Sequence, residues 1–384
     1  MIKVGFILNF NKEDWLGGYN YYRNLFLFLK NSDDQKIEPV ILTDSLSRYK
    51  NDRNINKLKI IENNFFSKSS AVTRIFHKVL VIFFGKNFFL EAVLKKHDIK
   101  AISHKGFLGR YSKVKSFPWF PDFQEIYFPE NFSKKDLILR RLDIFFSKIH
   151  GTKIIISSKQ VRSDLKKIDE GAFKKSILLK HPINLPKPSS IPSFGQLKKK
   201  YNIKKKYFFL PNHYWKHKNH MIVLEALKKL DKKNFIIIST GQTYDHRDPT
   251  YFFRFKEALK DKNIIQHYKI LGIIPFEDMV ALMQHSIAVI NPSKSEGLSN
   301  TVEQAKALGK AVILSNISIH REQKGNNFFF FNPDNYLELA AILFKLSIKK
   351  AIKVKANKLN KKLLNEQTIF INKYQNFIIS NLKE

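Results

Sequence analysis

The sequence predicts an α/β protein that consists of two Rossmann-like, doubly wound domains. Three observations lead to this prediction. The chain has 384 residues, which is long for one domain and suits two domains of roughly 150–200 residues each. Hydrophobic residues make up 43% of the chain, enough to bury two cores. Short apolar runs alternate with amphipathic stretches, a pattern typical of parallel strands covered by helices on both faces.

In the first half, compact apolar runs flanked by polar residues are expected to be strands. They are Lys3–Leu8, Val40–Leu42 and Ile154–Ile156, and the amphipathic stretch Tyr21–Lys30 is expected to be a helix. The second half repeats the pattern more regularly. Its expected strands are Tyr207–Leu210, Phe235–Ser239, Ile264–Ile270, Ile287–Ile290 and Ala311–Leu314. Its expected helices are His220–Leu230, Tyr251–Lys260, Phe276–His285 and Asn300–Leu308.

A proline-rich segment, His181–Lys200, separates the two halves and contains four prolines. Proline lacks a backbone donor and disfavours helix in the residue before it, so this segment is expected to be an extended linker. We therefore place an N-terminal domain at 1–185 and a C-terminal domain at 186–365. The remaining segment, 366–384, belongs to a lysine- and asparagine-rich stretch with apolar residues at helical spacing.

The composition excludes several classes of protein. Cysteine is absent, which rules out disulfide scaffolds, cysteine nucleophiles and cysteine metal sites and suits a reducing compartment. The first residues, MIKVGFILNF, lack the long apolar region of a signal peptide. The most apolar run, Val79–Phe84, is far shorter than the about 18 residues that cross a bilayer. We therefore expect a cytoplasmic protein that is soluble or peripheral to a membrane.

The chain is strongly basic, with 68 Lys and Arg against 33 Asp and Glu and a formal net charge of +35. Such a charge attracts anions, among them nucleotides, phosphates, acidic lipid surfaces and nucleic acid. The sequence is also rich in Asn, Ile and Phe, whose codons, like those of Lys, are A/T-rich. A codon bias and a selected anionic partner therefore both remain open as the origin of the charge.

The segment Asn291–His320 has the composition of a ligand site at the end of a parallel strand. An expected strand ends near Asn291, a small polar loop follows, and a helix begins near Asn300. Ligands of open parallel sheets bind outside the carboxyl ends of strands, and a helix N-terminus at that position suits phosphate. Glu296 in the loop can accept hydrogen bonds from sugar or ribose hydroxyls, and Gly297 lets the backbone approach a ligand closely.

This segment resembles glycosyltransferase family 4, the retaining group 1 glycosyl transferases of the GT-B fold. The family carries two glutamates eight positions apart, and here Glu296 matches the first while Gln304 stands at the second. The family's following Ala-x-Ala-x-Gly-x-Pro-Val is matched by Ala305, Ala307, Gly309 and Val312, with Ala311 in place of the proline. The second glutamate holds the nucleotide ribose in the family; a glutamine can still form that hydrogen bond but carries no charge.

Two further stretches extend the resemblance on the donor side. Gly17 and Gly18 follow the first expected strand and open the first helix, where family members carry a glycine pair; an ordinary turn is the alternative. After the first strand of the second domain, Lys218 matches the family's diphosphate-binding lysine. His213 stands near the position of the family's arginine, so Lys216 is the expected substitute, against the alternative of a solvated basic loop. We expect no metal site among the histidines of this loop, because no carboxylate or cysteine partner follows.

The acceptor is expected at Trp119–Ser133, which resembles one branch of the family with a Trp-x-x-Asp-Phe-Gln stretch. The resemblance implies that Asp122 and Gln124 face the acceptor sugar while Trp119 or Phe123 stacks on it. A packed loop with a surface carboxylate is the alternative. His320 and Arg321 follow another expected strand. Contact with the donor and capping of a helix are equally favoured as their role.

The resemblance implies a GT-B enzyme with two domains facing across a cleft, the donor on the second domain and the acceptor on the first. The helix at 366–384 would pack back on the N-terminal domain. The activity implied is metal-independent, retaining transfer of a hexose from a UDP- or GDP-linked sugar, without a cofactor. The acceptor would be a glycan or lipid-linked saccharide in lipopolysaccharide or capsule synthesis, at the inner face of the cell membrane. The implied catalytic residues are Glu296 and Asp122, and the implied donor-binding residues are Gly17, Gly18, Lys216, Lys218, Glu296, Gly297, Leu298, Ser299, Asn300 and Gln304.

Three alternatives stay open at this point. An epimerase of the same fold would act on a sugar nucleotide without an acceptor, and a scaffold would bind the nucleotide sugar without turnover. A nucleic-acid-binding protein is suggested by the charge alone, and because no recognition module is present we expect no nucleic-acid partner. The chain contains no Asp-x-Asp, no P-loop and no Gly-x-Ser-x-Gly, which disfavours metal-bridged GT-A transferases, P-loop enzymes and common hydrolases.

Overall fold

The computed structural model describes residues 1–10, 15–49, 52, 55–66, 71–106, 108–231, 233–348 and 356–382. The chain divides into two compact units. The first unit comprises Met1–Phe123, Ser133–Pro182 and Leu364–Glu384, and the second comprises Gln124–Phe132 and Ile183–Leu363. The domain boundary that we placed between 185 and 186 thus falls between 182 and 183. The segment Gln124–Phe132, which we placed in the N-terminal domain, belongs to the second unit.

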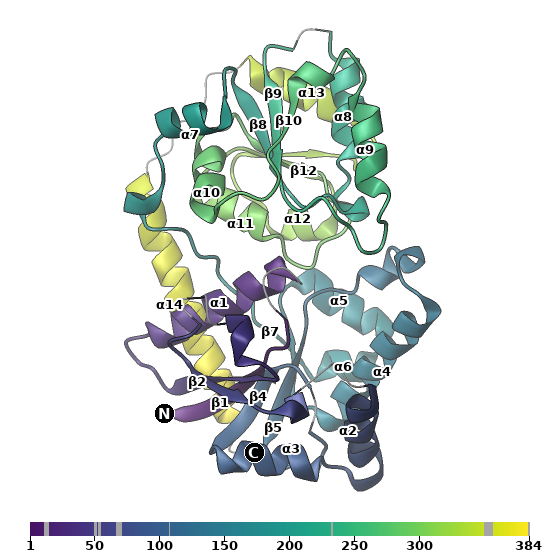
Figure 1. The fold of residues 1–384 in the computed structure, drawn as a ribbon, viewed down its shortest axis with the longest axis vertical. Helices are drawn as coiled ribbons and strands as arrows, with labels where there is room; N and C mark the ends of the chain where they lie inside the picture. Colours follow the sequence, from purple (N-terminus) through teal and green to yellow (C-terminus); the bar gives the residue numbers. More distant parts are fainter. Residues whose placement is uncertain are drawn as a thin grey trace. The chain divides into compact units, whose positions relative to one another are not determined.

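The first unit is built on a seven-stranded sheet with the order β3-β2-β1-β4-β5-β6-β7. All of its neighbouring strands run parallel. The strands are β1 Ile2–Ile7, β2 Ile37–Thr43, β3 Lys59–Glu62, β4 Ile99–His104, β5 Lys115–Phe120, β6 Ile154–Ile156 and β7 Ser176–Leu178. The helices are α1 Leu16–Lys30, α2 Ala71–Phe84, α3 Phe88–Lys96, α4 Lys134–His150, α5 Lys159–Ile168, α6 Glu170–Lys174 and, from Leu364 on, α14 Ala356–Ser380 (Figure 1).

The second unit is built on a six-stranded parallel sheet with the order β10-β9-β8-β11-β12-β13. Its strands are β8 Tyr207–Pro211, β9 Ile236–Thr240, β10 Tyr268–Ile270, β11 Val289–Asn291, β12 Val312–Ser315 and β13 Phe328–Phe331. Its helices are α7 Phe194–Tyr201, α8 Met221–Lys229, α9 Tyr251–Leu259, α10 Phe276–His285, α11 Asn300–Ala307, α12 Ser318–Glu322 and α13 Tyr336–Ser347.

Alternation of side chains along the strands explains why both faces of the second sheet carry helices. Phe208 and Leu210 of β8 pack in a core cluster with α8, α9 and α13. Tyr207 and Phe209 of the same strand point the other way, into a cluster with α7, α10 and α11. Successive residues of a strand face opposite sides of its sheet, so a strand that is apolar at every position must be covered twice. The predicted fold class, two doubly wound Rossmann-like α/β domains, is confirmed.

The segment His181–Lys200, predicted to be an extended linker, is only partly extended. Its last residues form the start of α7, which Ser193 caps. The Ser193 side chain accepts a hydrogen bond from the Gln196 backbone N–H, and the Gln196 side chain accepts one from the Ser193 N–H. This reciprocal capping box overcomes the local effect of the prolines, all of which precede it.

The strand order reverses at the same place in each unit. In the second unit β8 lies between β9 and β11, and in the first unit β1 lies between β2 and β4. Connections leave two neighbouring strands in opposite directions there, and ligands of open parallel sheets bind outside the carboxyl ends of strands at such a point. In the second unit, the loops that begin at Asn212 and Pro292 follow the two strands of the reversal point.

The C-terminal helix α14 forms part of the core of the first unit. Tyr374, Phe377 and Ile378 lie in one cluster with residues of β1 and α1. The Tyr374 hydroxyl donates to Ser103 Oγ at 2.8 Å. The Gln375 side-chain carbonyl accepts hydrogen bonds from the backbone N–H groups of Lys36 and Ile37, at 2.7 and 3.1 Å, where β2 begins. The last helix therefore completes a core built from the first residues of the chain.

Replacement of Tyr374 tests this dependence. Tyr374 is 1% exposed, whereas Ile369 on the same helix is 58% exposed. We expect Tyr374→Ala to destabilise the first unit by about 3–5 kcal/mol, since it removes a large buried ring. Ile369→Ala, the matched control, should change stability by less than about 0.5 kcal/mol. Denaturant unfolding followed by circular dichroism measures both, and equal effects would contradict the assignment.

Candidate functional site

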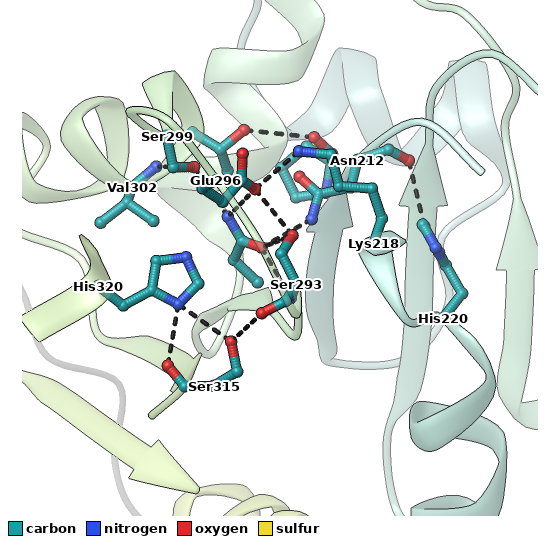
Figure 2. A network of polar contacts seen from close by, with 12 residues as sticks. Asn212, Lys218, His220, Ser293, Glu296, Ser299, Val302, Ser315 and His320 are labelled. Atoms are coloured by element: carbon teal, nitrogen blue, oxygen red, sulfur yellow. Dashed lines mark hydrogen bonds and ion pairs between the residues drawn. The ribbon is translucent and has the colours of Figure 1, made fainter. Parts of the chain in front are cut away.

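The two loops at the reversal point of the second unit are joined by a buried amide pair. The Asn212 side-chain N–H₂ donates to Asn291 Oδ1 at 3.0 Å, and both residues are buried. Asn291 in turn donates to Ser299 Oγ at 2.8 Å. Since Asn291 closes β11 and Ser299 begins α11, one buried side chain connects both strand ends to the start of a helix (Figure 2).

Glu296 is the charged centre of this network. Its Oε1 lies 2.7 Å from the Lys218 ammonium, 2.8 Å from Ser293 Oγ and 3.4 Å from the Asn291 side-chain nitrogen. The side chains of Glu296 and Lys218 are only 9% and 14% exposed. The loop after β8 therefore supplies the positive charge, the loop after β11 supplies the negative charge, and Figure 2 shows the two meeting between the strands.

The ion pair determines the protonation state of the carboxyl group. Burial by itself would raise the pKa of Glu296, but the Lys218 ammonium next to it, together with His320 and His217, lowers that pKa to about 2. An opposite charge within hydrogen-bond distance favours the ionised form more strongly than partial burial disfavours it. Glu296 is consequently a carboxylate at any physiological pH.

The N-terminus of α11 is held by side chains on two sides. Ser299 is the N-cap and its hydroxyl accepts from the Val302 N–H. Gln323, which is fully buried, accepts from the Ser299 N–H at 3.2 Å and donates to the Ser299 carbonyl at 2.9 Å. It also donates to Glu303 at 3.0 Å. The positive end of the helix dipole is thereby fixed close to Glu296.

His320 is buried beside this network with one ring nitrogen unsatisfied. Its Nδ1 lies 2.9 Å from the Ser315 carbonyl oxygen, so this nitrogen carries the proton and donates. Its Nε2 is buried and has no hydrogen-bond partner in the part of the chain that the structure describes. Burial lowers the pKa of His320 to about 4 despite the nearby Glu296 carboxylate, which raises it. The neutral ring therefore presents an acceptor lone pair. The His320 ring bonds to Ser315 and does not cap a helix, so of the two roles weighed for it, donor contact and helix capping, the second does not apply.

The histidines of the loop after β8 have packing and backbone partners. His213 Nδ1 accepts from the Gln242 N–H at 2.8 Å, and His220 stacks on Tyr214 with ring centroids 4.2 Å apart. Burial lowers the pKa of His213 to about 4 and that of His220 to about 3, so both rings are neutral. Within the described ranges no three His, Asp or Glu residues are grouped so that they could hold a metal ion.

The two lysines predicted to bind the donor differ in their surroundings. Lys218 pairs with Glu296. Lys216 is exposed, and its positive charge is among the causes that lower the pKa of Asp248. Gln304 is half-buried on α11 and its side chain forms no hydrogen bond within the described residues. Gly309, predicted to end this helix, has a φ of 64°, a left-handed conformation that glycine adopts without strain.

Arg247 was not predicted from the sequence. It follows β9, the neighbour of β8, and its guanidinium hydrogen-bonds to Gln124 and lies 4.8 Å from the Phe132 ring centroid. His217 has a lowered pKa mainly through burial, and the Arg247 charge is among the further causes. An arginine is therefore present near the loop after β8, although that loop contains none. The sequence feature that could have identified Arg247 was its position in the loop beyond the carboxyl end of a predicted strand.

The predicted residues Gly17, Gly18, Trp119, Asp122 and Phe123 lie in the first unit. Gly17 and Gly18 are in the first turn of α1, as predicted, and a Cβ on Gly18 would collide with the Trp15 ring at 2.1 Å. Gly18 is thus required by packing. Asp122 is 43% exposed and lies 3.5 Å from the Arg140 guanidinium. The structure assigns Asp122 and Glu296 to different units, so it describes no site that contains both.

The aromatic residues near Asp122 differ in exposure. Trp119 is half-buried, stacks on Tyr21 with centroids 4.3 Å apart and donates to Ser157 Oγ at 2.8 Å. Phe123 is buried at 2% exposure, so it is a core residue and is unsuited to stack on a sugar. Of the two predicted stacking residues, Trp119 alone has a partly exposed ring.

Two parallel sheets, ordered β3-β2-β1-β4-β5-β6-β7 and β10-β9-β8-β11-β12-β13, in two Rossmann-like units are the architecture of the GT-B class of glycosyltransferase fold. Residues 193–365 match the family of group 1 glycosyl transferases. The matched residues include Glu296 and Lys218.

The chain is also similar to individual proteins. The chain is 24% identical over 215 residues to the O-antigen chain mannosyltransferase RfbU of Salmonella typhimurium, a match that spans 56% of each chain. It resembles a glycosyltransferase structure from Rickettsia africae with a TM-score of 0.71 at 17% identity, over 100% of this chain and 99% of that one. It also resembles Anabaena HepE in complex with UDP-glucose, with a TM-score of 0.70 at 14% identity, over 99% and 100% of the two chains. The structural likenesses establish the fold.

Acid titration tests the ion pair. Because the pKa of Glu296 is lowered from 4.5 to about 2 in the folded protein, the pair stabilises the protein fully above pH 4.5. That contribution is lost as the pH falls from 4.5 towards 2, since the unfolded carboxyl binds its proton first. We expect Glu296→Gln to lower the melting temperature most above pH 5, with the deficit shrinking at lower pH.

The control for this titration is Glu225→Gln, which removes a surface carboxylate paired with Lys228. Exposed pairs contribute little to stability, so its melting curve should follow the wild type at every pH. A Glu296→Gln deficit that stays constant from pH 7 down to pH 2 would show that the ion pair does not have the inferred strength.

Proposed function

We propose that this protein is a retaining, metal-independent glycosyltransferase that moves a hexose from a UDP- or GDP-linked sugar to a glycan or lipid-linked acceptor. The observation that carries the proposal is the Glu296–Lys218 ion pair, which lies at the reversal point of the second sheet beside the N-terminus of α11. A carboxylate, an ammonium and a helix N-terminus at one strand edge supply what a sugar diphosphate requires: acceptors for hydroxyl groups and positive charge for phosphate.

The chemistry requires stabilisation of a nucleoside diphosphate as it leaves. Negative charge grows on the diphosphate when the glycosidic bond breaks, and preorganised positive groups lower the barrier at that moment. Lys218 is held in position by Glu296, and the α11 N-terminus is fixed by Ser299 and Gln323. In the proposal these groups, with Lys216 and the backbone of residues 297–300, stabilise the leaving diphosphate without a metal.

Glu296 and His320 have complementary tasks in this proposal. Glu296 Oε1 is occupied by Lys218, Ser293 and Asn291, while its other oxygen can accept hydrogen bonds from donor hydroxyls. His320 Nε2 is a buried acceptor without a partner among the described residues, and an unpaired buried acceptor is costly unless a ligand satisfies it. Gln304 is available to the nucleotide ribose. No enzymic nucleophile is needed if the acceptor hydroxyl attacks on the face that the diphosphate leaves.

The acceptor side rests on the first unit. We assign Asp122 to the acceptor hydroxyl and Gly17 and Gly18 to the donor phosphate. The identity of the acceptor is inferred from RfbU, which is named an O-antigen chain mannosyltransferase. The proposed role is therefore surface polysaccharide synthesis, in the cytoplasm or at the inner face of the cell membrane. No helix in the described part of the chain is long and apolar enough to cross a membrane.

Mutation of the ion pair tests the proposal after a thermal-shift panel with UDP, GDP, ADP and their hexose conjugates has identified the donor. With that donor, we expect Lys218→Ala to weaken nucleoside-diphosphate affinity about tenfold or more, and Glu296→Ala to lower turnover by about 10²–10³. Lys345→Ala, an exposed lysine on α13, should leave both unchanged.

Three results would contradict the proposal. Full turnover by Glu296→Ala would remove this residue from the site. Binding of a nucleotide sugar by the wild type without transfer to any saccharide acceptor would favour the scaffold instead, an alternative that Gln304 at the second acidic position motivates. Release of an epimerised nucleotide sugar without an acceptor would favour an epimerase.

The dependence of donor affinity on pH follows from the protonation states of the site. The pKa of Glu296 is lowered to about 2 and that of His320 to about 4, so neither group changes charge between roughly pH 5.5 and 8. A sugar diphosphate keeps its charge over this range as well. We expect the affinity for the intact donor, measured by calorimetry, to vary less than about twofold there. A step centred near the ordinary pKa of histidine would show that a site histidine titrates.

A further inference from the structure

The first unit exposes an unusually large set of apolar side chains on α2, α3 and α4. Monomeric soluble proteins rarely expose contiguous apolar patches beyond a few hundred Å², and larger ones mark binding surfaces. We call this surface the α2–α4 face. The apolar residues that form it, each 36% exposed or more, are Phe65, Phe76, Val79, Ile82, Phe83, Phe84, Phe88, Phe89, Tyr111, Ile138, Leu139, Leu142, Phe145 and Ile149.

The aromatic residues of α2 and α3, with Phe65, form two groups of rings in contact. Phe84 at the end of α2 contacts Phe88 at the start of α3, with ring centroids 5.8 Å apart. Phe89 contacts Phe76 at 5.7 Å and stacks on Phe65 at 6.1 Å. These rings touch one another and remain exposed, so their contacts do not bury them in the core of the unit.

Backbone contacts connect these groups to α4. The Tyr111 N–H donates to the Gly85 carbonyl at 3.0 Å, which places the exposed Tyr111 ring against the turn between α2 and α3. The Arg110 N–H donates to His150 Nδ1, the last residue of α4, at 3.3 Å. The loop of Arg110 and Tyr111 thus joins the ends of the two exposed regions.

On α4 the exposed apolar residues form a stripe. Ile138, Leu142, Phe145 and Ile149 follow the spacing of one helix face, and each is exposed. Only Ile144 and Ser147 of this helix are buried. A helix of a soluble protein normally turns its apolar stripe inward, whereas α4 carries one outward and has no partner for it in the described part of the chain.

Positive charge accompanies the exposed rings. Three aromatic residues of the α2–α4 face each have a cation close to the ring: Lys86 lies 4.8 Å from the Phe88 centroid, Arg110 lies 4.7 Å from Tyr111, and Lys148 lies 5.3 Å from Phe145. The sequence of α2 contains no acidic residue. Aromatic and aliphatic side chains interleaved with Lys and Arg are the composition of surfaces that bind the interface of anionic bilayers.

We propose that the α2–α4 face docks on an anionic lipid bilayer, with Phe83, Phe84 and the α4 stripe entering the headgroup layer and the basic side chains contacting lipid phosphates. Phe83 is the most exposed residue of the face, at 76%. Burial of several rings supplies affinity for any bilayer, and the net charge of +35 selects anionic ones. This proposal rests on the proposed function, because the membrane is where the enzyme would meet a lipid-linked acceptor. Vesicle binding is measured without donor or acceptor, so the two proposals fail separately.

Sedimentation with vesicles tests the docking. We expect the full chain to bind vesicles of phosphatidylcholine and phosphatidylglycerol at 3:1 at least about tenfold more strongly than vesicles of phosphatidylcholine alone, and more weakly in high salt. The double variant Phe83→Ser/Phe84→Ser should lose about tenfold or more of this binding. The matched control is Phe253→Ser/Ile273→Ser, which removes two equally exposed apolar side chains from the second unit.

A second readout reports insertion directly. Tryptophan at position 83 (Phe83→Trp) should be quenched by brominated lipids, whereas Phe253→Trp should not. Unchanged melting temperatures would show that the exposed substitutions leave the fold intact. Equal vesicle binding by the wild type and Phe83→Ser/Phe84→Ser, or equal loss by the control, would overturn the proposal. Self-association through this face without vesicle binding, detected by light scattering, would overturn it in favour of a second copy as partner.

Discussion

The largely buried pair of Glu296 and Lys218 is the interaction on which the second unit's candidate site depends. A carboxylate that is 9% exposed is stable only if another charge and hydrogen bonds compensate for the water it has lost. Lys218 supplies the charge, and Ser293 and Asn291 complete the set of donors. Because these groups come from the loops after β8 and β11, the pair also determines how those loops approach each other. An anionic ligand that enters here meets a prearranged charge pattern.

The two units combine similar folds with different supports. In the second unit, both faces of the sheet are covered by helices that are local in sequence to their strands. In the first unit, α14 returns from the end of the chain to fill the core beside β1 and α1, and Gln375 binds the backbone at the start of β2. The first unit is therefore complete only when the last residues of the chain are present, which links the folding of the two ends.

Much of the fold was readable from apolar runs. The predicted helix Phe276–His285 and strand Ile154–Ile156 coincide with α10 and β6. The capping box of Ser193 and Gln196 was present in the sequence as Ser-x-x-Gln, and the prolines before it led to the wrong prediction of an extended segment. In the site, Glu296 was identified from its position after a strand and Lys218 from the family resemblance, but no local pattern indicated that they pair with each other. Arg247 was missed because the loop that follows β9 has no recognisable motif.

The sequence by itself determined the fold class and the position of the loops after β8 and β11, since apolar periodicity and helix caps are local properties that neighbouring residues decide. The tertiary structure decided which of the predicted residues meet. Lys218 reaches Glu296 while Lys216, two positions away, remains exposed, and His320 keeps a buried, unsatisfied nitrogen beside the carboxylate. The α2–α4 face likewise became visible only in three dimensions, because a stripe that normally packs inward looks the same in sequence as one left exposed. Burial is a property of the whole arrangement of elements, and it is burial that gives these side chains their charge states and their exposure.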